Sequence, residues 1–259
     1  MNKKIIEIQK KKNKSKIVSL TAYSKNIAKI LDKYCDIVLV GDSMANVLYG
    51  LNNTHSISLE NIIQHTISVR KGVKDSLLVV DMPKGTYSNS RIAKKNAKSI
   101  MKLTKCDALK IESNGRNFNI IEELVKIKIP VMGHIGFTPQ FKRNFKIEGA
   151  SKKKAIKLLK EAKNIQKSGA FSIVLECISP LASKLITKDL RIPTIGIGSS
   201  SYCDGQILVT DDMLGMSGFY PKFVKKYAYL ERAIEKAVKK YTREVKSKKF
   251  PTTKNFLNG

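Results

Sequence analysis

Five short apolar runs in this sequence each end on or beside an ionisable side chain. In chain order, these residues are Asp42, Asp81, Glu112, His134 and Glu176. Carboxylates and imidazoles are the groups that proteins use to move protons and to hold metal ions. If the runs are parallel strands of one barrel, their carboxyl ends meet at a single mouth. The pattern therefore predicts one polar site assembled from several strand ends.

Each of these residues also has a structural explanation when it is taken alone. An Asp after a strand is often the N-cap of the next helix, and Lys110 within its run could extend its ammonium to the surface. Three carboxylates in one mouth would repel one another unless a cation neutralises them. Since Asp42, Asp81 and Glu112 offer hard oxygen ligands, we expect Mg2+ rather than zinc.

The runs that must position these side chains are rich in Val, Ile and Leu and lack polar alternation. Such composition is typical of strands that are covered on both faces. Seven runs meet this description: 17–20, 37–40, 77–80, 108–111, 131–133, 172–175 and 194–197. A weaker eighth candidate spans 206–210.

Segments with helical spacing lie between these runs, for example at 26–33 and 156–165. Alternating strands and helices predict a parallel α/β architecture. Eight strands in 259 residues favour one (β/α)8 TIM barrel domain over 1–259, with a helix at 227–246 covering it. An open, doubly wound sheet is the alternative, but its GxGxxG fingerprint is absent. In a barrel, the loop at Gly196–Gly198 could instead bind an anionic group.

The formal net charge of +28 raises the alternative of a nucleic-acid partner. Lysines occur in nearly every segment, however, and no helix-turn-helix or aromatic RNA-binding signature accompanies them. We therefore expect no nucleic acid. The four cysteines form no CxxC pair, which favours reduced thiols. No secretory signal or apolar run of membrane-spanning length is present, so we expect a cytoplasmic protein without a membrane partner.

Several short motifs, taken in their order along the chain, resemble those of the ketopantoate hydroxymethyltransferase family. The resemblance extends over residues 3 to 250. The most specific strings are VGDS at 40–43, GHIGFTPQ at 133–140 and DGQILV at 204–209. Supporting strings are LTAY at 20–23, LKIE at 109–112, VLEC at 174–177, IGIG at 195–198 and PKF at 221–223.

The resemblance implies a barrel of the phosphoenolpyruvate/pyruvate type and a one-carbon transferase. The enzyme would transfer a hydroxymethyl group from 5,10-methylenetetrahydrofolate to 3-methyl-2-oxobutanoate and so form 2-dehydropantoate, in pantothenate biosynthesis. One Mg2+ per subunit and assembly into a large homo-oligomer, commonly a decamer, are also implied.

The resemblance also implies a role for each site residue. Asp42 and Asp81 would bind Mg2+, with Glu112 near the metal directly or through water. Ser43 and Lys110, together with the two metal-binding aspartates, would hold the 2-oxo acid. Glu176 would accept the C3 proton, with His134 in a polar supporting role.

Elementary chemistry agrees with these roles. A 2-oxo acid chelates Mg2+, which acts as a Lewis acid and stabilises the enolate formed when C3 loses its proton. Lys110 adds positive charge where the oxyanion develops. A Schiff base at Lys110 is the alternative, but activation by metal makes it unnecessary. The enolate then attacks the one-carbon unit.

Three short segments depart from the family pattern: Ser24, Lys84-Gly85 and Glu148-Gly149-Ala150. They leave every expected site residue intact and bear on folate affinity and rate. A lyase or mutase on the same scaffold is the main alternative activity, and it would need no folate.

Overall fold

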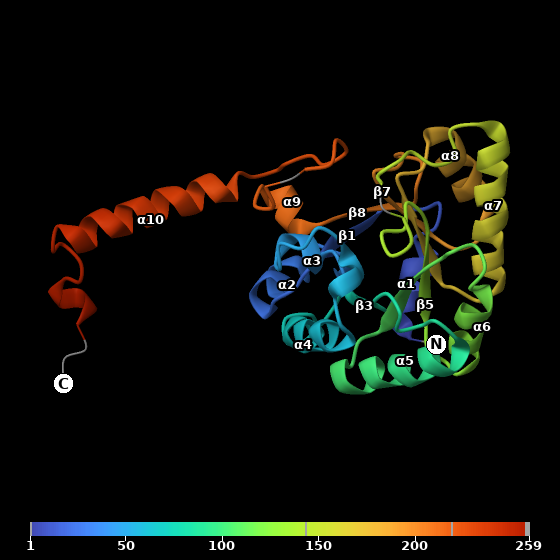
Figure 1. The fold of residues 1–259 in the computed structure, drawn as a ribbon, viewed down its shortest axis with the longest axis horizontal. Helices are drawn as coiled ribbons and strands as arrows, with labels where there is room; N and C mark the ends of the chain where they lie inside the picture. Colours follow the sequence, from blue (N-terminus) through green and yellow to red (C-terminus); the bar gives the residue numbers. More distant parts are fainter. Residues whose placement is uncertain (1, 143, 219, 257–259) are drawn as a thin grey trace. The chain divides into compact units, whose positions relative to one another are not determined.

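Eight parallel strands form a closed barrel in the computed structural model, which describes residues 2–142, 144–218 and 220–256 (Figure 1). Each strand pairs with the next one along the chain, and β8 closes the barrel against β1. The strands are β1 (Ile17–Thr21), β2 (Ile37–Val40), β3 (Leu77–Asp81), β4 (Ala108–Glu112), β5 (Val131–Gly136), β6 (Ser172–Glu176), β7 (Thr194–Ile197) and β8 (Gly205–Leu208). The expected TIM barrel is thus confirmed.

Helices connect most of the strands, and others precede the first strand or follow the last one. They are α1 (Lys3–Lys10), α2 (Lys25–Leu31), α3 (Met44–Val47), α4 (Leu59–Arg70), α5 (Ser90–Thr104), α6 (Phe118–Lys126), α7 (Lys152–Lys167), α8 (Pro180–Asp189), α9 (Thr210–Leu214) and α10 (Leu230–Lys246), with short 3-10 turns η1 (Thr54–Ser56) and η2 (Thr253–Asn255). Neighbouring helices pack in pairs, such as α7 against α8. The predicted helices at 26–33 and 156–165 correspond to α2 and to part of α7.

Polar N-cap residues begin several of the helices that follow the carboxyl ends of the strands. Asn89, Ser151 and Ser179 each accept a hydrogen bond from a backbone N–H in the first turn of α5, α7 and α8, respectively. Such caps satisfy amide groups that have no partner inside the helix. The aspartates Asp42 and Asp81 are not among these caps, so the N-cap explanation does not apply to them.

Five of the strands, β1 and β3 to β6, extend one to three residues further than the apolar runs suggested. β3, β4 and β6 end on Asp81, Glu112 and Glu176 themselves, so these side chains belong to the sheet and not to the loops. The eighth strand was predicted at 206–210, but it ends at Leu208. The Thr210 N–H and hydroxyl bond instead to Thr21, which turns the chain into α9.

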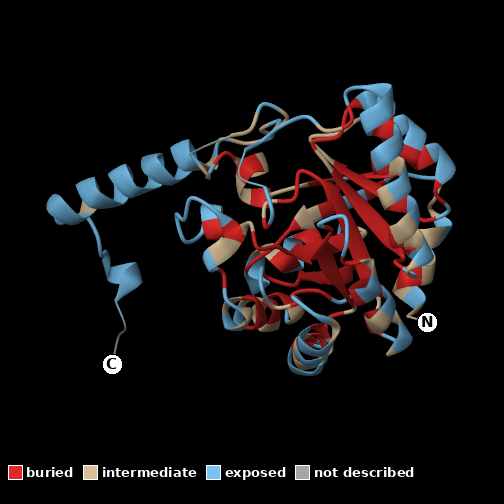
Figure 2. Ribbon diagram, turned by 45° about the vertical axis from the view of Figure 1, so that its right-hand side comes forward, coloured by how far each residue is buried: buried red, intermediate tan, exposed pale blue. Residues whose placement is uncertain are grey.

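The barrel interior is apolar below the mouth. Strand side chains such as Ile37, Leu77 and Met132 form one buried cluster together with Ile5 and Ile8 of α1. Figure 2 shows the barrel strands mostly in the colour of buried residues. The two α1 residues sit with the lower ends of the strands, since neighbouring Lys4 donates to carbonyls just before β3. A closed, packed lower half leaves the carboxyl ends of the strands as the polar end of the barrel.

The chain divides into two compact units, Met1–Thr210 and Asp211–Gly259. The first contains all eight strands, and the second contains α10. As its spacing predicts, α10 is amphipathic, and none of its residues is buried. That α10 covers the barrel, and that the whole chain is one domain, stay predictions. None of the helices in the described ranges is both long and apolar enough to cross a bilayer.

Candidate active site

The barrel brings the expected ionisable residues together at its mouth. In the register of the sheet, Asp81 lies beside Lys110 and Glu112 lies beside His134. Lys110 and Glu112 are two residues apart on β4 and therefore face the same side. Asp42, Asp81, Lys110, Glu112 and His134 are all at most 6% exposed. Such burial of charged groups is rare unless they are paired or functional.

Asp42 and Asp81 lie directly against each other. The backbone N–H of Asp42 donates a hydrogen bond to Asp81 Oδ2 over 3.0 Å. Gly41, which precedes Asp42, makes this approach possible, because a Cβ there would lie 3.4 Å from Asp81 Oδ2 and 2.9 Å from Ser43 Oγ. The same distances put the Ser43 hydroxyl beside the aspartate pair. Ser43 Oγ also lies 2.9 Å from Tyr23 Oη.

Lys110 is the cation of this cluster. Its Nζ lies 2.7 Å from Asp81 Oδ1 and 3.3 Å from His134 Nδ1. Burial opposes protonation of the Lys110 amine, but the charges of Asp81, Glu112 and Asp42 outweigh it and raise the pKa of Lys110. Because an ammonium can only donate, His134 Nδ1 must accept, which leaves the imidazole proton on Nε2.

His134 links Lys110 to Glu176. His134 Nε2 lies 3.2 Å from Glu176 Oε2, without the alignment of a full hydrogen bond. Burial and the charge of Lys110 lower the pKa of His134, so the ring is neutral at pH 7. Burial raises the pKa of Glu176, and the nearby imidazole opposes this shift in part. A carboxylate whose pKa is raised is a stronger base than an exposed one.

The carboxylates of this cluster outnumber its cation, Lys110, and the pKa values of two of them are raised. Burial raises the pKa of Asp42 well above its usual range, and the charges of Asp81 and Glu112 add to the effect. Burial likewise raises the pKa of Glu112, to about 7, against the attraction of Lys110. Both carboxyls would release their protons more easily if a further positive charge entered the site.

The donor set suits a divalent cation with oxygen ligands. Asp81 Oδ1 and Glu112 Oε1 are buried and accept no hydrogen bond from the described residues, although Asp81 Oδ1 contacts the Lys110 ammonium. No group of three His, Cys, Asp or Glu side chains in the described ranges is already arranged around a common point. The protein would therefore supply one or two carboxylates and leave the other positions to water and substrate, as Mg2+ sites commonly do.

Gln140 is a site residue that sequence reasoning missed. It is 1% exposed, lies in the loop between β5 and α7, and hydrogen-bonds to Asp42 and Glu112. It belongs to the GHIGFTPQ string, but its amide carries no charge and follows no strand directly. The string was the only signal that could have indicated it.

The three departures from the family pattern lie around this site. Ser24 precedes α2 as its N-cap residue without a capping side-chain bond. Lys84 Nζ lies 3.1 Å from His55 Nδ1, and Gly85 has φ +83° in an open turn. Glu148 Oε1 pairs with Lys142 Nζ over 2.7 Å, and the Glu148 N–H donates to the carbonyl of Cys177, next to Glu176.

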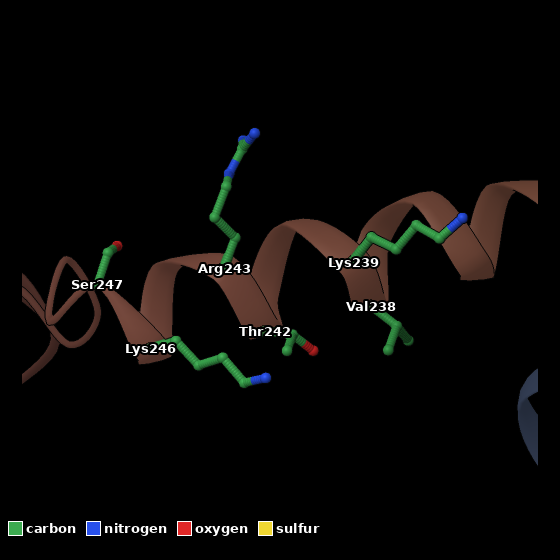
Figure 3. A pocket seen from close by; sticks show the side chains of 6 residues that line it. All are labelled: Val238, Lys239, Thr242, Arg243, Lys246 and Ser247. Atoms are coloured by element: carbon green, nitrogen blue, oxygen red, sulfur yellow. The ribbon is translucent and has the colours of Figure 1, made fainter.

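A surface hollow elsewhere lies along α10 (Figure 3). Its lining residues are Val238, Lys239, Thr242, Arg243, Lys246 and Ser247. This lining contains no Asp, Glu or His side chain that could act as a general base. Its composition therefore supports no catalytic role. The loop at Gly196–Gly198 keeps its anion-binding role as a prediction.

Comparison with known proteins gives matches over nearly the full length. The family model for ketopantoate hydroxymethyltransferase matches residues 2–253. The 3-methyl-2-oxobutanoate hydroxymethyltransferase of Pelagibacter ubique (strain HTCC1062) is 51% identical, with 98% of this chain and 99% of the relative covered. The enzyme of the same name from Anaplasma marginale (strain St. Maries) is 46% identical, with 95% and 90% covered.

Solved structures share the fold at low identity. A phosphonopyruvate hydrolase superposes with a TM-score of 0.65 at 10% identity, covering 99% of this chain and 92% of that one. A 2,3-dimethylmalate lyase of the PEP mutase/isocitrate lyase superfamily gives 0.61 at 14% identity, with 100% and 93% covered. These likenesses confirm the expected (β/α)8 barrel fold.

Proposed function

The chain belongs to the ketopantoate hydroxymethyltransferase family, and we propose that it is a 3-methyl-2-oxobutanoate hydroxymethyltransferase. It would form 2-dehydropantoate, with 5,10-methylenetetrahydrofolate as the one-carbon donor. The observation that carries the proposal is the buried group of Asp42, Asp81, Lys110 and Glu112 at the barrel mouth, next to the His134–Glu176 pair. This cluster supplies the side chains that such a reaction needs, which the similarity to relatives does not do by itself.

We propose that Asp42 and Asp81 hold one Mg2+ per subunit, with Glu112 close to it. Their contact through the Asp42 N–H supports a shared ligand site, as do the raised pKa values of Asp42 and Glu112. When bound, Mg2+ supplies a Lewis acid for the carboxylate and ketone oxygens of the 2-oxo acid. Ser43, which lies beside the aspartates, would donate a hydrogen bond to the substrate carboxylate.

The remaining residues would handle the charge and the proton of the substrate. Lys110 would face the ketone oxygen, where negative charge develops as C3 loses its proton. Glu176 would accept that proton, because its raised pKa brings its basicity toward working pH. His134 would hold the Glu176 carboxylate through Nε2, while its Nδ1 accepts from Lys110. The C3 carbanion would then form a C–C bond to the methylene carbon of the folate, and both C–N bonds of that carbon would break. Water would supply the hydroxyl oxygen, and its remaining proton together with the proton taken by Glu176 would go to the two nitrogens of the departing tetrahydrofolate.

The experiment is a product assay with purified protein. Complete reaction mixtures with 3-methyl-2-oxobutanoate, methylenetetrahydrofolate and Mg2+ should form 2-dehydropantoate, and omission of the folate or addition of EDTA should stop its formation. Folded, metal-supplied protein that forms no product would refute the activity. Cleavage of a 2-oxo acid without any one-carbon donor would indicate a lyase instead.

We further propose a cytoplasmic homodecamer, in line with what the family resemblance implies. In a single chain, α10 leaves four apolar side chains at least 42% exposed: Ile234, Val238, Tyr241 and Val245. Contiguous apolar surface of this kind is typical of interaction sites. Light scattering coupled to size-exclusion chromatography would give the mass, and a monomer at working concentration would refute the assembly.

A further inference from the structure

Gln140 joins two of the proposed metal-binding carboxylates, although the proposed reaction gives it no task. Its side-chain Nε2 donates to Asp42 Oδ2 over 2.8 Å and to the carbonyl of Met82 over 3.0 Å. Its backbone N–H donates to Glu112 Oε2 over 3.0 Å. One buried residue thus fixes one oxygen of Asp42 and one oxygen of Glu112.

The orientation of the Gln140 amide follows from its surroundings. The Met82 carbonyl can only accept, so the NH2 end of the amide, which reaches both this carbonyl and Asp42 Oδ2, must face them. The Tyr87 hydroxyl donates to the opposite end, Gln140 Oε1, over 2.5 Å. Burial and the neighbouring carboxylates raise the pKa of the Tyr87 phenol, which keeps it protonated as a donor. Tyr87 therefore holds the amide against rotation.

We propose that Gln140, oriented by Tyr87, is a positioning residue that sets the direction of Asp42 and Glu112 for the divalent cation. A carboxylate with one oxygen held in a hydrogen bond presents its other oxygen in a defined direction, which lowers the entropy lost when a metal binds. Glu112 Oε1 accepts no hydrogen bond from any residue that the structure describes, as a ligand oxygen kept ready would require. This inference rests on the proposed function, because it assumes a metal at these carboxylates.

A purely structural role is the competing explanation. In that case Gln140 would only satisfy the buried Met82 carbonyl, and its loss would lower stability without a specific effect on metal binding. The two explanations predict different metal affinities for a variant without the Gln140 side chain. A positioning role predicts weaker metal binding, whereas a purely structural role predicts lower stability with unchanged metal binding.

Three variants separate these explanations. Gln140→Ala removes both side-chain donations but keeps the backbone N–H that reaches Glu112. Tyr87→Phe keeps the amide and removes only the hydroxyl that orients it. Gln166→Ala is the control away from the site, because the Gln166 side-chain amide also holds backbone, by accepting from Arg191 N–H and Ile192 N–H near the C-terminal end of α7.

The measurements are Mg2+ titration calorimetry and Mn2+ electron paramagnetic resonance on the purified full chain, together with melting temperatures. Gln140→Ala should weaken metal binding by about ten- to a hundred-fold, the range typical of residues that orient metal ligands. Its Mn2+ spectrum should change in zero-field splitting. Tyr87→Phe should weaken binding less, and Gln166→Ala should lower the melting temperature while it binds metal as the parent does.

The outcomes are distinct. If the parent forms product and binds metal, but Gln140→Ala and Tyr87→Phe bind it equally tightly, the inference is overturned and the proposed function stands. If the parent neither binds metal nor forms product, both are overturned. Should Gln140→Ala fail to fold, Tyr87→Phe decides, since a Tyr87→Phe affinity equal to that of the parent overturns the positioning role.

Discussion

The Lys110 ammonium forms a buried ion pair with Asp81, 2.7 Å from Nζ to Oδ1. The two residues are neighbours in the sheet, on β4 and β3. Removal of one partner from such a pair leaves the other charge buried without compensation. The Lys110 ammonium therefore serves two purposes. It stabilises the barrel mouth by compensating the Asp81 charge, and the proposed reaction needs it beside the ketone oxygen.

Replacement of Lys110 by Met should abolish most of the activity. Met fills similar volume but carries no charge, so the oxyanion loses a preorganised partner, which typically costs about 10²–10³ in kcat. Steady-state assay of 2-dehydropantoate formation measures the loss, and a melt with Mg2+ present checks folding. Retention of more than half the parent kcat would exclude Lys110 from the chemistry. Lys163→Met, at an exposed pair with Asp189, is the control and should stay active.

Glu176→Gln should slow proton exchange at C3 of the oxo acid far more than it weakens substrate binding. The amide keeps the size of the side chain but cannot accept the proton, and loss of a general base typically costs about 10²–10⁴ in rate. Deuterium uptake from D2O into 3-methyl-2-oxobutanoate, followed by NMR without folate, isolates this step. Equal uptake by variant and parent would remove Glu176 from the base role.

The metal-free protein should lose stability as pH rises through the range set by Glu112. Burial raises the pKa of Glu112 from 4.5 to about 7. The folded state then binds more protons than the unfolded state between these values, so the stability contribution is full below about pH 4.5 and is lost as pH rises toward 7. Glu112→Gln removes this dependence. The difference between the two pH profiles should be on the order of 3 kcal/mol over that range.

Urea denaturation of both proteins in EDTA, at several pH values between 4.5 and 7.5, tests this. The comparison also cancels the opposite contribution of His134, whose pKa is lowered by burial and by Lys110. Parallel profiles for parent and Glu112→Gln would show that Glu112 does not titrate in this range. Saturating Mg2+ should flatten the parent profile, because a bound cation favours the ionised carboxylate.

Much of the site could be predicted because its charged residues sit at strand ends. Asp81, Glu112 and Glu176 each terminate a run of Val, Ile and Leu, and parallel strands direct those ends to one mouth. Gln140 could not be predicted in this way, since it lies in a loop whose path depends on tertiary contacts. The contribution of α1 to the barrel interior was also missed, because a few isoleucines among lysines give a weak signal, and only two of them, Ile5 and Ile8, are buried.

Strands β3, β4 and β6 were each predicted one residue too short at the carboxyl end, for a related reason. A charged residue ends an apolar run by composition, but the ladder of backbone hydrogen bonds continues through it when a neighbouring side chain neutralises its charge. Asp81 pairs with Lys110 in this manner, and both remain within their strands. Patterns of hydropathy therefore end β3, β4 and β6 one residue before the charged side chain that still belongs to the strand.

Gly136→Ala should damage both folding and proton exchange at C3, whereas Gly85→Ala should lower stability without slowing this exchange. Both glycines have positive φ, +97° and +83°, which strains any residue with a Cβ by about 1–2 kcal/mol. At Gly136 an added Cβ would also lie 2.1 Å from the carbonyl oxygen of Glu176, whereas at Gly85 it would meet nothing within 4 Å. The difference between the two variants therefore isolates the close approach of the backbone to Glu176. Chemical denaturation and the C3 exchange assay measure the two effects. If Gly136→Ala, once folded, exchanges C3 protons as fast as Gly85→Ala does, the β5 turn has no part in holding the proposed base.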